Sequence, residues 1–260
     1  MKIGCCITYK DSAKIRLAKE LGFDFIETGL SSFDKATVDD VAAFQAVLDE
    51  TGLPCPAVNC FFPGYIRLTG ENADFNAAKE YMERIFELVR PIGIEQVVFG
   101  SGGSRKVPEG FAKEKATEQL ITFCRDYVAP TVGKFGITCC IEELNKKECN
   151  IVNSCAEAME IVRAVDRPEI RLLVDLYHVD MEAEPLETLA GYAGYITHVH
   201  IASAKNARAF PAAGDGEDYA RFFGILRRAD YKNERISIEG SDKGDFVGAS
   251  RASLACLKAL

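Results

Sequence analysis

The sequence predicts an α/β protein of the (β/α)₈ TIM-barrel class, in a single domain spanning residues 1–260. Short runs rich in β-branched and aromatic residues alternate with longer amphipathic runs, and this pattern repeats eight times along the chain. Several amphipathic runs end at a glycine, as helices often do. The length of 260 residues also fits, because barrels of about 250 residues fold as one unit.

The expected strands follow one another at intervals that leave room for a helix. Each is short and mostly apolar, which is typical of parallel strands buried on both faces. They cover Lys2–Ile7, Phe25–Thr28, Ala57–Phe62, Gln96–Gly100, Thr138–Glu142, Leu172–Asp175, Ile196–Ile201 and Ile236–Glu239.

A run that favours a helix follows each expected strand, and many of these runs have apolar residues at i, i+3, i+4 and i+7. Gly22, Gly52, Gly93 and Gly136 stand where a left-handed cap would end a helix. An open doubly wound sheet is the competing prediction, but its Gly-rich first turn is missing from "ITYKDSAK". The helical runs cover residues 11–22, 36–52, 72–93, 114–136, 154–166, 185–194, 216–231 and 245–260.

The composition limits the classes of partner. The 39 acidic and 31 basic residues give a net charge of −8, which argues against nucleic acid or an anionic membrane. The chain has neither an apolar run of about 20 residues nor the apolar core of a signal peptide, so we expect a cytoplasmic protein. Its ten cysteines form no CxxC pair and are expected to be free thiols.

Four consecutive strands end in a side chain that can bind a metal. Glu142, Asp175, His200 and Glu239 should lie at similar heights around one half of the barrel mouth, where barrel active sites are built. Buried carboxylates are costly without compensation, and a divalent cation is a common one. Three carboxylates and one imidazole suit Mn²⁺ or Mg²⁺ better than Zn²⁺. The spacing leaves open whether Glu142 or Glu143 points inward.

Two of the three histidines belong to the stretch "YITHVHIAS". Residues i and i+2 of a strand face the same way, so His198 and His200 share the barrel interior. We expect His200 to be the ligand and His198, one step deeper, to be a core histidine bonded to a polar neighbour. The stretch "FGSGGSR" from Phe99 resembles an anion-binding loop, although a glycine-rich turn often provides only tight geometry.

The segments "CIEELNKKE", "LVDLYHVDME", "HVHIASAKNARAFPAAGDGEDYARFFGIL" and "ISIEG" resemble the sugar isomerase/epimerase family with a xylose-isomerase-like barrel. Ketohexose 3-epimerases and hydroxypyruvate isomerases are the relatives that this resemblance suggests. The resemblance implies one divalent ion held by Glu142, Asp175, His200 and Glu239. Mn²⁺ is the expected ion, with Mg²⁺ and Co²⁺ as alternatives.

The resemblance also implies the substrate contacts and the reaction. Glu148, His178 and Arg208 match family residues that bind a small carbohydrate. Proton transfer through an enediolate is the expected chemistry, with Glu142 and Glu239 as the pair of bases. Return of the proton to the same carbon gives an epimerase, and return to the adjacent carbon gives an isomerase. The sequence does not choose between them, and it leaves a homo-oligomer open.

Three rival functions use a barrel of the same kind. An endonuclease with this barrel needs a three-zinc cluster with many histidines, and this chain has three histidines and an acidic surface. A dehydratase of a keto-inositol would keep the metal and the same bases. A non-catalytic sugar-binding accessory subunit would not need to keep all four ligands.

Overall fold

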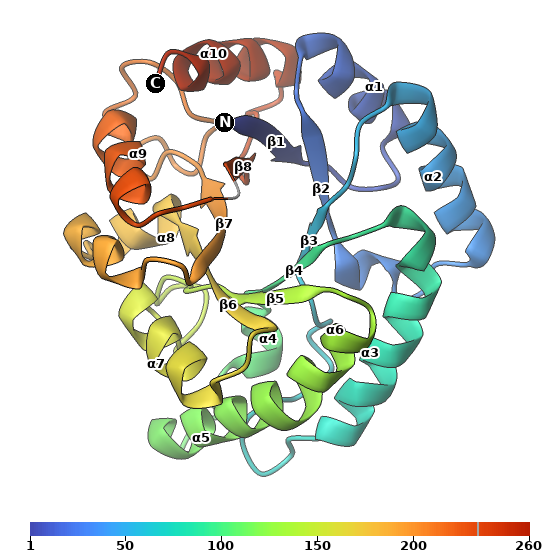
Figure 1. Ribbon diagram of the computed structural model, residues 1–260, viewed down its shortest axis with the longest axis vertical. Helices are drawn as coiled ribbons and strands as arrows, with labels where there is room; N and C mark the ends of the chain where they lie inside the picture. The colour runs from blue at the N-terminus through green and yellow to red at the C-terminus, as the bar shows by residue number, and fades with distance from the viewer. Residues whose placement is uncertain (233) are drawn as a thin grey trace.

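A computed structural model describes residues 1–232 and 234–260 of the protein. In this part of the chain, parallel strands close into a barrel in the order β1 to β8, and each pairs with its neighbours in sequence. Figure 1 looks down the barrel, with the strands in the centre and the helices around them. The expected fold class is confirmed. The strands are β1 (Lys2–Cys6), β2 (Phe25–Gly29), β3 (Ala57–Asn59), β4 (Gln96–Phe99), β5 (Thr138–Ile141), β6 (Ile170–Asp175), β7 (Ile196–Ile201) and β8 (Arg235–Ile238).

The helices begin and end at local signals that the sequence contains. Asp11 and Thr37 accept hydrogen bonds from the first turns of α1 and α2, and Gly22 and Gly52 end these helices with left-handed backbone. The α-helices are α1 (Ser12–Leu21), α2 (Val38–Thr51), α3 (Phe75–Val89), α4 (Gly102–Arg105), α5 (Lys113–Phe123), α6 (Ala129–Lys134), α7 (Cys155–Val165), α8 (Leu176–Met181), α9 (Tyr219–Arg228) and α10 (Phe246–Lys258).

Three elements differ from the expectation. The third strand ends at Asn59 and not at Phe62, because Cys60 takes a positive φ of 48° and turns the chain. The run 114–136 is not one regular helix, since a π-helical segment, Cys124–Val128, separates α5 from α6. Pro130 follows at the start of α6 and has no N–H to donate to the preceding turn. The run 185–194 forms a 3₁₀ helix, Leu186–Tyr192.

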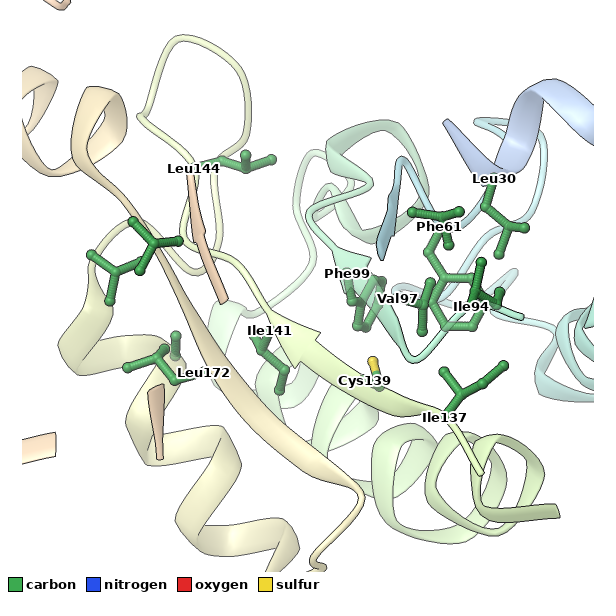
Figure 2. Close-up of a cluster of buried hydrophobic side chains, with 14 of the residues drawn as sticks. Leu30, Phe61, Ile94, Val97, Phe99, Ile137, Cys139, Ile141, Leu144 and Leu172 are labelled. Atoms are coloured by element: carbon green, nitrogen blue, oxygen red, sulfur yellow. The ribbon is translucent and has the colours of Figure 1, made fainter. Parts of the chain in front are cut away.

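Side chains of successive strand residues go to two different cores. Val97 and Phe99 of β4 and Cys139 and Ile141 of β5 belong to the large cluster between strands and helices, which Figure 2 shows. Val98, Cys140 and Leu173 form a separate small cluster. Because side chains alternate between the two faces of a strand, this small cluster lies inside the barrel. The residues two positions further along each strand face the same way and lie nearer the mouth. Those residues include Glu142 and Asp175.

Two further observations concern the chain as a whole. No helix within residues 1–232 and 234–260 is both long enough and apolar enough to cross a membrane. All ten cysteines lie in these two ranges and are free thiols, as expected.

Candidate metal centre

The four expected ligands converge at the mouth of the barrel. Glu142 follows β5, Asp175 ends β6, His200 lies in β7 and Glu239 follows β8. One ligand atom from each lies within 4.8 Å of those of the other three. Strand pairing sets their heights, because Asp175 pairs with His200 in the β6–β7 register.

The question of which glutamate points inward is answered by the hydrogen bonds. The carboxylate of Glu142 lies beside His200, with Oε1 3.2 Å from Nδ1. Glu143 is also buried, but its Oε1 accepts the backbone N–H of Asp175 at 2.8 Å. Glu142 therefore faces the centre of the mouth, while Glu143 holds the end of β6 from outside.

The imidazole of His200 presents its two nitrogens to different groups. Nδ1 faces the ligand side, 3.2 Å from Glu142 Oε1 and 3.5 Å from Glu239 Oε2. Nε2 faces away from them and lies 2.9 Å from Oε1 of Glu27, a buried carboxylate on β2. An ion held by the four expected residues would thus meet Nδ1.

Asp175 supplies a test of whether these residues fit a cation. Its Oδ1 accepts the N–H of Tyr177 at 2.9 Å, whereas its buried Oδ2 has no hydrogen-bond partner among the described residues. Burial, together with the charge of Glu239, raises the pKa of Asp175 to about 8. Three carboxylates and an imidazole, one carboxylate oxygen being buried without a hydrogen bond, form a donor set that suits a hard divalent ion.

Glu239 is held by two donors. Asn59 Nδ2, at the end of β3, donates to Oε1 at 2.6 Å, and Arg208 Nη2 donates to Oε2 at 2.6 Å. Burial opposes the ionisation of Glu239, but the charge and hydrogen bond of His200 and the charge of Arg208 outweigh it. The pKa of Glu239 falls to about 2, so this carboxylate is ionised at neutral pH.

The end of β4 makes room for Glu142 and fixes its backbone. A Cβ on Gly100 would lie 1.9 Å from Oε2 of Glu142, so this glycine leaves the space that the carboxylate fills. The fully buried guanidinium of Arg105 donates to the carbonyl oxygens of Phe99 and Glu142, both at 2.7 Å. The arginine of the "FGSGGSR" stretch thus braces the ends of β4 and β5 and does not present its charge to an anion.

His178 offers a hydrogen-bond donor beside Asp175. Its Nδ1 accepts the backbone N–H of Asn145 at 3.2 Å, which places the proton of the neutral ring on Nε2. Burial and the charge of Arg208 lower the pKa of His178 to about 3, so the ring is neutral. Within the described part of the chain, Nε2 has no hydrogen-bond partner, and it lies 3.5 Å from Asp175 Oδ2.

The other two expected substrate residues meet at the rim. Arg208 Nη1 lies 3.1 Å from Oε1 of the exposed Glu148, and the guanidinium lies over the ring of Tyr177 at 4.6 Å. Close approach of backbone positions this loop, because a Cβ on Gly240 would lie 2.8 Å from the carbonyl oxygen of Arg208. The structure thus brings Glu148, His178 and Arg208 together around the four expected ligands.

His198 lies where the sequence places it, deeper in the barrel than His200. It is fully buried, and its Nε2 is 2.8 Å from Oε2 of Glu27. Burial lowers the pKa of His198 despite the charge of Glu27, which favours a neutral ring.

Sequence reasoning missed the groups that support the ligands: Glu27, Asn59, Gly100 and Arg105. A signal existed for Glu27, since a carboxylate inside the apolar run "FDFIETG" is unusual and needs partners. The signal for Asn59 was weaker, because a single amide at a strand end is common.

Comparison with known proteins places the chain in a family. A sequence model described as Xylose isomerase-like TIM barrel matches residues 15–260. The chain belongs to this family. The expected resemblance is confirmed, and with it the expectation that the chain is an enzyme.

Named relatives align with most of the chain. The chain is 27% identical over 252 residues to a 3-dehydro-D-guloside 4-epimerase of Escherichia coli, which covers 94% of this chain and 93% of the relative. It is 25% identical over 242 residues to a probable ketose 3-epimerase of Synechocystis, at 91% and 80% coverage. A crystal structure of D-psicose 3-epimerase in the presence of D-fructose superposes with a TM-score of 0.86 and 19% identity, covering 100% of this chain and 99% of that one. At 19% identity, this structural similarity supports the fold alone.

Proposed function

We propose that this xylose isomerase-like protein is a divalent-metal-dependent epimerase of a small sugar or keto-sugar. The observation that carries the proposal is the gathering of two glutamates, Glu142 and Glu239, 3.2 and 3.5 Å from His200 Nδ1, in one cluster with the non-hydrogen-bonded oxygen of Asp175. The names of the relatives, a 3-dehydro-guloside 4-epimerase and ketose 3-epimerases, support the same reaction class.

The proposed ion is Mn²⁺, with Mg²⁺ and Co²⁺ as alternatives, held by Glu142, Asp175, His200 and Glu239. When bound, such an ion polarises a carbonyl and makes the neighbouring C–H bond more acidic. Its coordination would also engage Oδ2 of Asp175, which has no hydrogen bond in the described part of the protein.

The two glutamates are proposed to move the proton. They come from β5 and β8, so their carboxylates can approach a bound sugar carbon from different sides. One carboxylate takes the proton from the carbon next to the carbonyl, and the other carboxyl group returns a proton to the opposite face, which inverts that carbon. A positioned base of this kind contributes about 10²–10⁴-fold to the rate.

Three further side chains are proposed to hold the sugar. The Nε2–H of His178 can donate to a carbonyl or hydroxyl oxygen, because it is buried beside Asp175 and its ring is neutral. Arg208 and Glu148 offer a donor and an acceptor at the rim, where sugar hydroxyls need both.

The test is deuterium exchange from solvent. The Mn²⁺-loaded protein is incubated in D₂O with separate ketoses, keto-glycosides, keto-inositols and hydroxypyruvate, and each mixture is followed by proton NMR. The proposal predicts exchange of a C–H next to the carbonyl, with inversion at that carbon. Proton return to the adjacent carbon would identify an isomerase, and loss of water from a keto-inositol would identify a dehydratase. Binding without exchange on any compound would identify an accessory subunit. Each of these three results would overturn the epimerase proposal.

A further inference from the structure

We infer that Glu27 is a positioning residue of the metal centre: it holds His200 through Nε2 and thereby directs Nδ1 to the ion. The inference rests on the metal site proposed above. Glu27 belongs to β2 and His200 to β7, strands that are not neighbours in the barrel. Their contact therefore crosses the barrel interior.

The carboxylate of Glu27 is enclosed and fully engaged. It is fully buried, and its Oε1 lies 2.9 Å from Nε2 of His200. Its Oε2 accepts the hydroxyl of Ser237 and lies 2.8 Å from Nε2 of His198. A buried carboxylate with three donors is fixed in position, and it has a structural reason to remain ionised.

The hydrogen bond to Glu27 determines which nitrogen of His200 can bind a metal. A neutral imidazole carries one N–H, and the other nitrogen has the lone pair. Both ring nitrogens face carboxylates, but Glu142 and Glu239 are proposed to bind the ion, which leaves Glu27 to accept the ring proton. The proton then belongs to Nε2 and the lone pair to Nδ1. Nδ1 is the nitrogen that faces Glu142 and Glu239, at 3.2 and 3.5 Å. A carboxylate behind a histidine ligand also makes the ligand more basic.

His198 and Ser237 have a different role in this arrangement. They contact the far oxygen of Glu27, so they fix the carboxylate that fixes His200. Both histidines of the "HVH" stretch are thus explained: one meets the ion, and the other holds the group behind the first.

A second cluster, Cys6, Glu27 and His200, also brings ligand atoms within 4.8 Å of one another. An ion there would have to displace the donors that already engage Glu27. Asp175, whose Oδ2 has no hydrogen bond among the described residues, belongs to the other cluster, on the Nδ1 side. These contacts place Glu27 behind the ligand and not around the ion.

The experiment measures Mn²⁺ affinity by calorimetry, with no sugar present. Glu27→Gln should weaken Mn²⁺ binding about 10–100-fold, because an amide can donate to Nε2 and shift the ring proton to Nδ1. Ser253→Ala is the matched control, since it removes another fully buried serine hydroxyl, one that donates to the carbonyl oxygen of Pro211 at 2.6 Å. Its affinity should stay within about threefold of the wild-type value. Glu27→Asp, which keeps the charge on a shorter side chain, serves if Glu27→Gln does not fold, and should weaken Mn²⁺ binding by more than Ser253→Ala.

A double-mutant cycle separates positioning from a merely structural role. In a His200→Gln background, Glu27→Gln should cause no further loss of Mn²⁺ affinity, since it acts through the imidazole. The same loss in both backgrounds, or wild-type affinity in Glu27→Gln, would overturn the inference. If the wild-type protein itself bound no Mn²⁺, the proposed metal site would fail instead, so the two failures are distinguishable.

Discussion

The two halves of the barrel mouth contribute different things to the site. The ends of β5 to β8 carry the side chains that would meet an ion, namely Glu142, Asp175, His200 and Glu239. Strands β2 and β3, and the residue that follows β4, carry groups that act on those side chains. Glu27 contacts His200, Asn59 donates to Glu239, and Gly100 leaves the space that Glu142 fills.

This difference separates two kinds of contribution to one centre. The ligand half provides charge and lone pairs, and its loss should damage binding and chemistry directly. The supporting half provides hydrogen bonds to the ligands, fixes the ring proton of His200 on Nε2 and leaves the space that the Glu142 carboxylate fills. Its loss should alter the geometry of ligands that remain present, with smaller effects.

The largest effect is expected in the ligand half, from Glu142→Gln and Glu239→Gln. A glutamine keeps an oxygen that can coordinate weakly, but it cannot accept a proton at neutral pH. Each variant should therefore keep part of its Mn²⁺ binding while turnover falls by about 10²–10⁴-fold, measured as kcat on the substrate found by exchange. Excess Mn²⁺ should partly rescue His200→Gln but neither glutamine variant. Rescue of a glutamine variant to near the full rate would show that the glutamate only holds the ion.

His198→Ala tests whether the deeper histidine acts on stability. Truncation leaves a buried oxygen of Glu27 without one of its donors, which should lower the free energy of unfolding by about 1–3 kcal/mol in a urea titration. Its loss of Mn²⁺ affinity should be smaller than that of His200→Ala. Equal losses of Mn²⁺ affinity in the two variants would mean that the wrong histidine has been assigned as the ligand.

Gly100→Ala tests the space that the supporting half provides. The new methyl group would lie 1.9 Å from Glu142 Oε2, so the carboxylate has to move away from its position. We expect Mn²⁺ affinity to fall about tenfold, because a displaced ligand is the main consequence. Gly191→Ala is the control, since no heavy atom lies within 4 Å of its added Cβ. Unchanged affinity in Gly100→Ala would contradict the role of this glycine.

The smallest effect concerns Asp180, which lies in α8 outside both halves and bonds to Glu217 in the loop that carries Arg208. Burial and the hydrogen bond with Glu217 raise its pKa to about 7, compared with about 3.9 in an unfolded chain. Between these values the folded state binds the proton more tightly, so this group's contribution to stability is lost as pH rises from about 4 to 7. Asp180→Asn should therefore gain about 1–2 °C in Tm relative to wild type on going from pH 5 to pH 8. If the difference in Tm between Asp180→Asn and wild type did not change with pH, the raised pKa of Asp180 would be contradicted.

The sequence predicts the ligand half because its signal is local. The C-terminal ends of the parallel strands all lie at one end of the barrel. Side chains alternate along each strand, so the sequence shows which of them face inward. The four polar residues at strand ends could therefore be recognised as one group. The supporting half depends on contacts that local patterns do not encode. Glu27 meets His200 across the barrel, from strands 2 and 7. The early end of β3 depends on the single positive φ of Cys60.

A crystal structure with Mn²⁺, located by its anomalous scattering, tests the central claim most directly. The expected result is one peak about 2.0–2.6 Å from Nδ1 of His200 and from oxygens of Glu142, Asp175 and Glu239, with Glu27 still bonded to Nε2. A peak on the Nε2 side, among Cys6, Glu27 and His200, would contradict the claim, because the supporting carboxylate would then be a ligand.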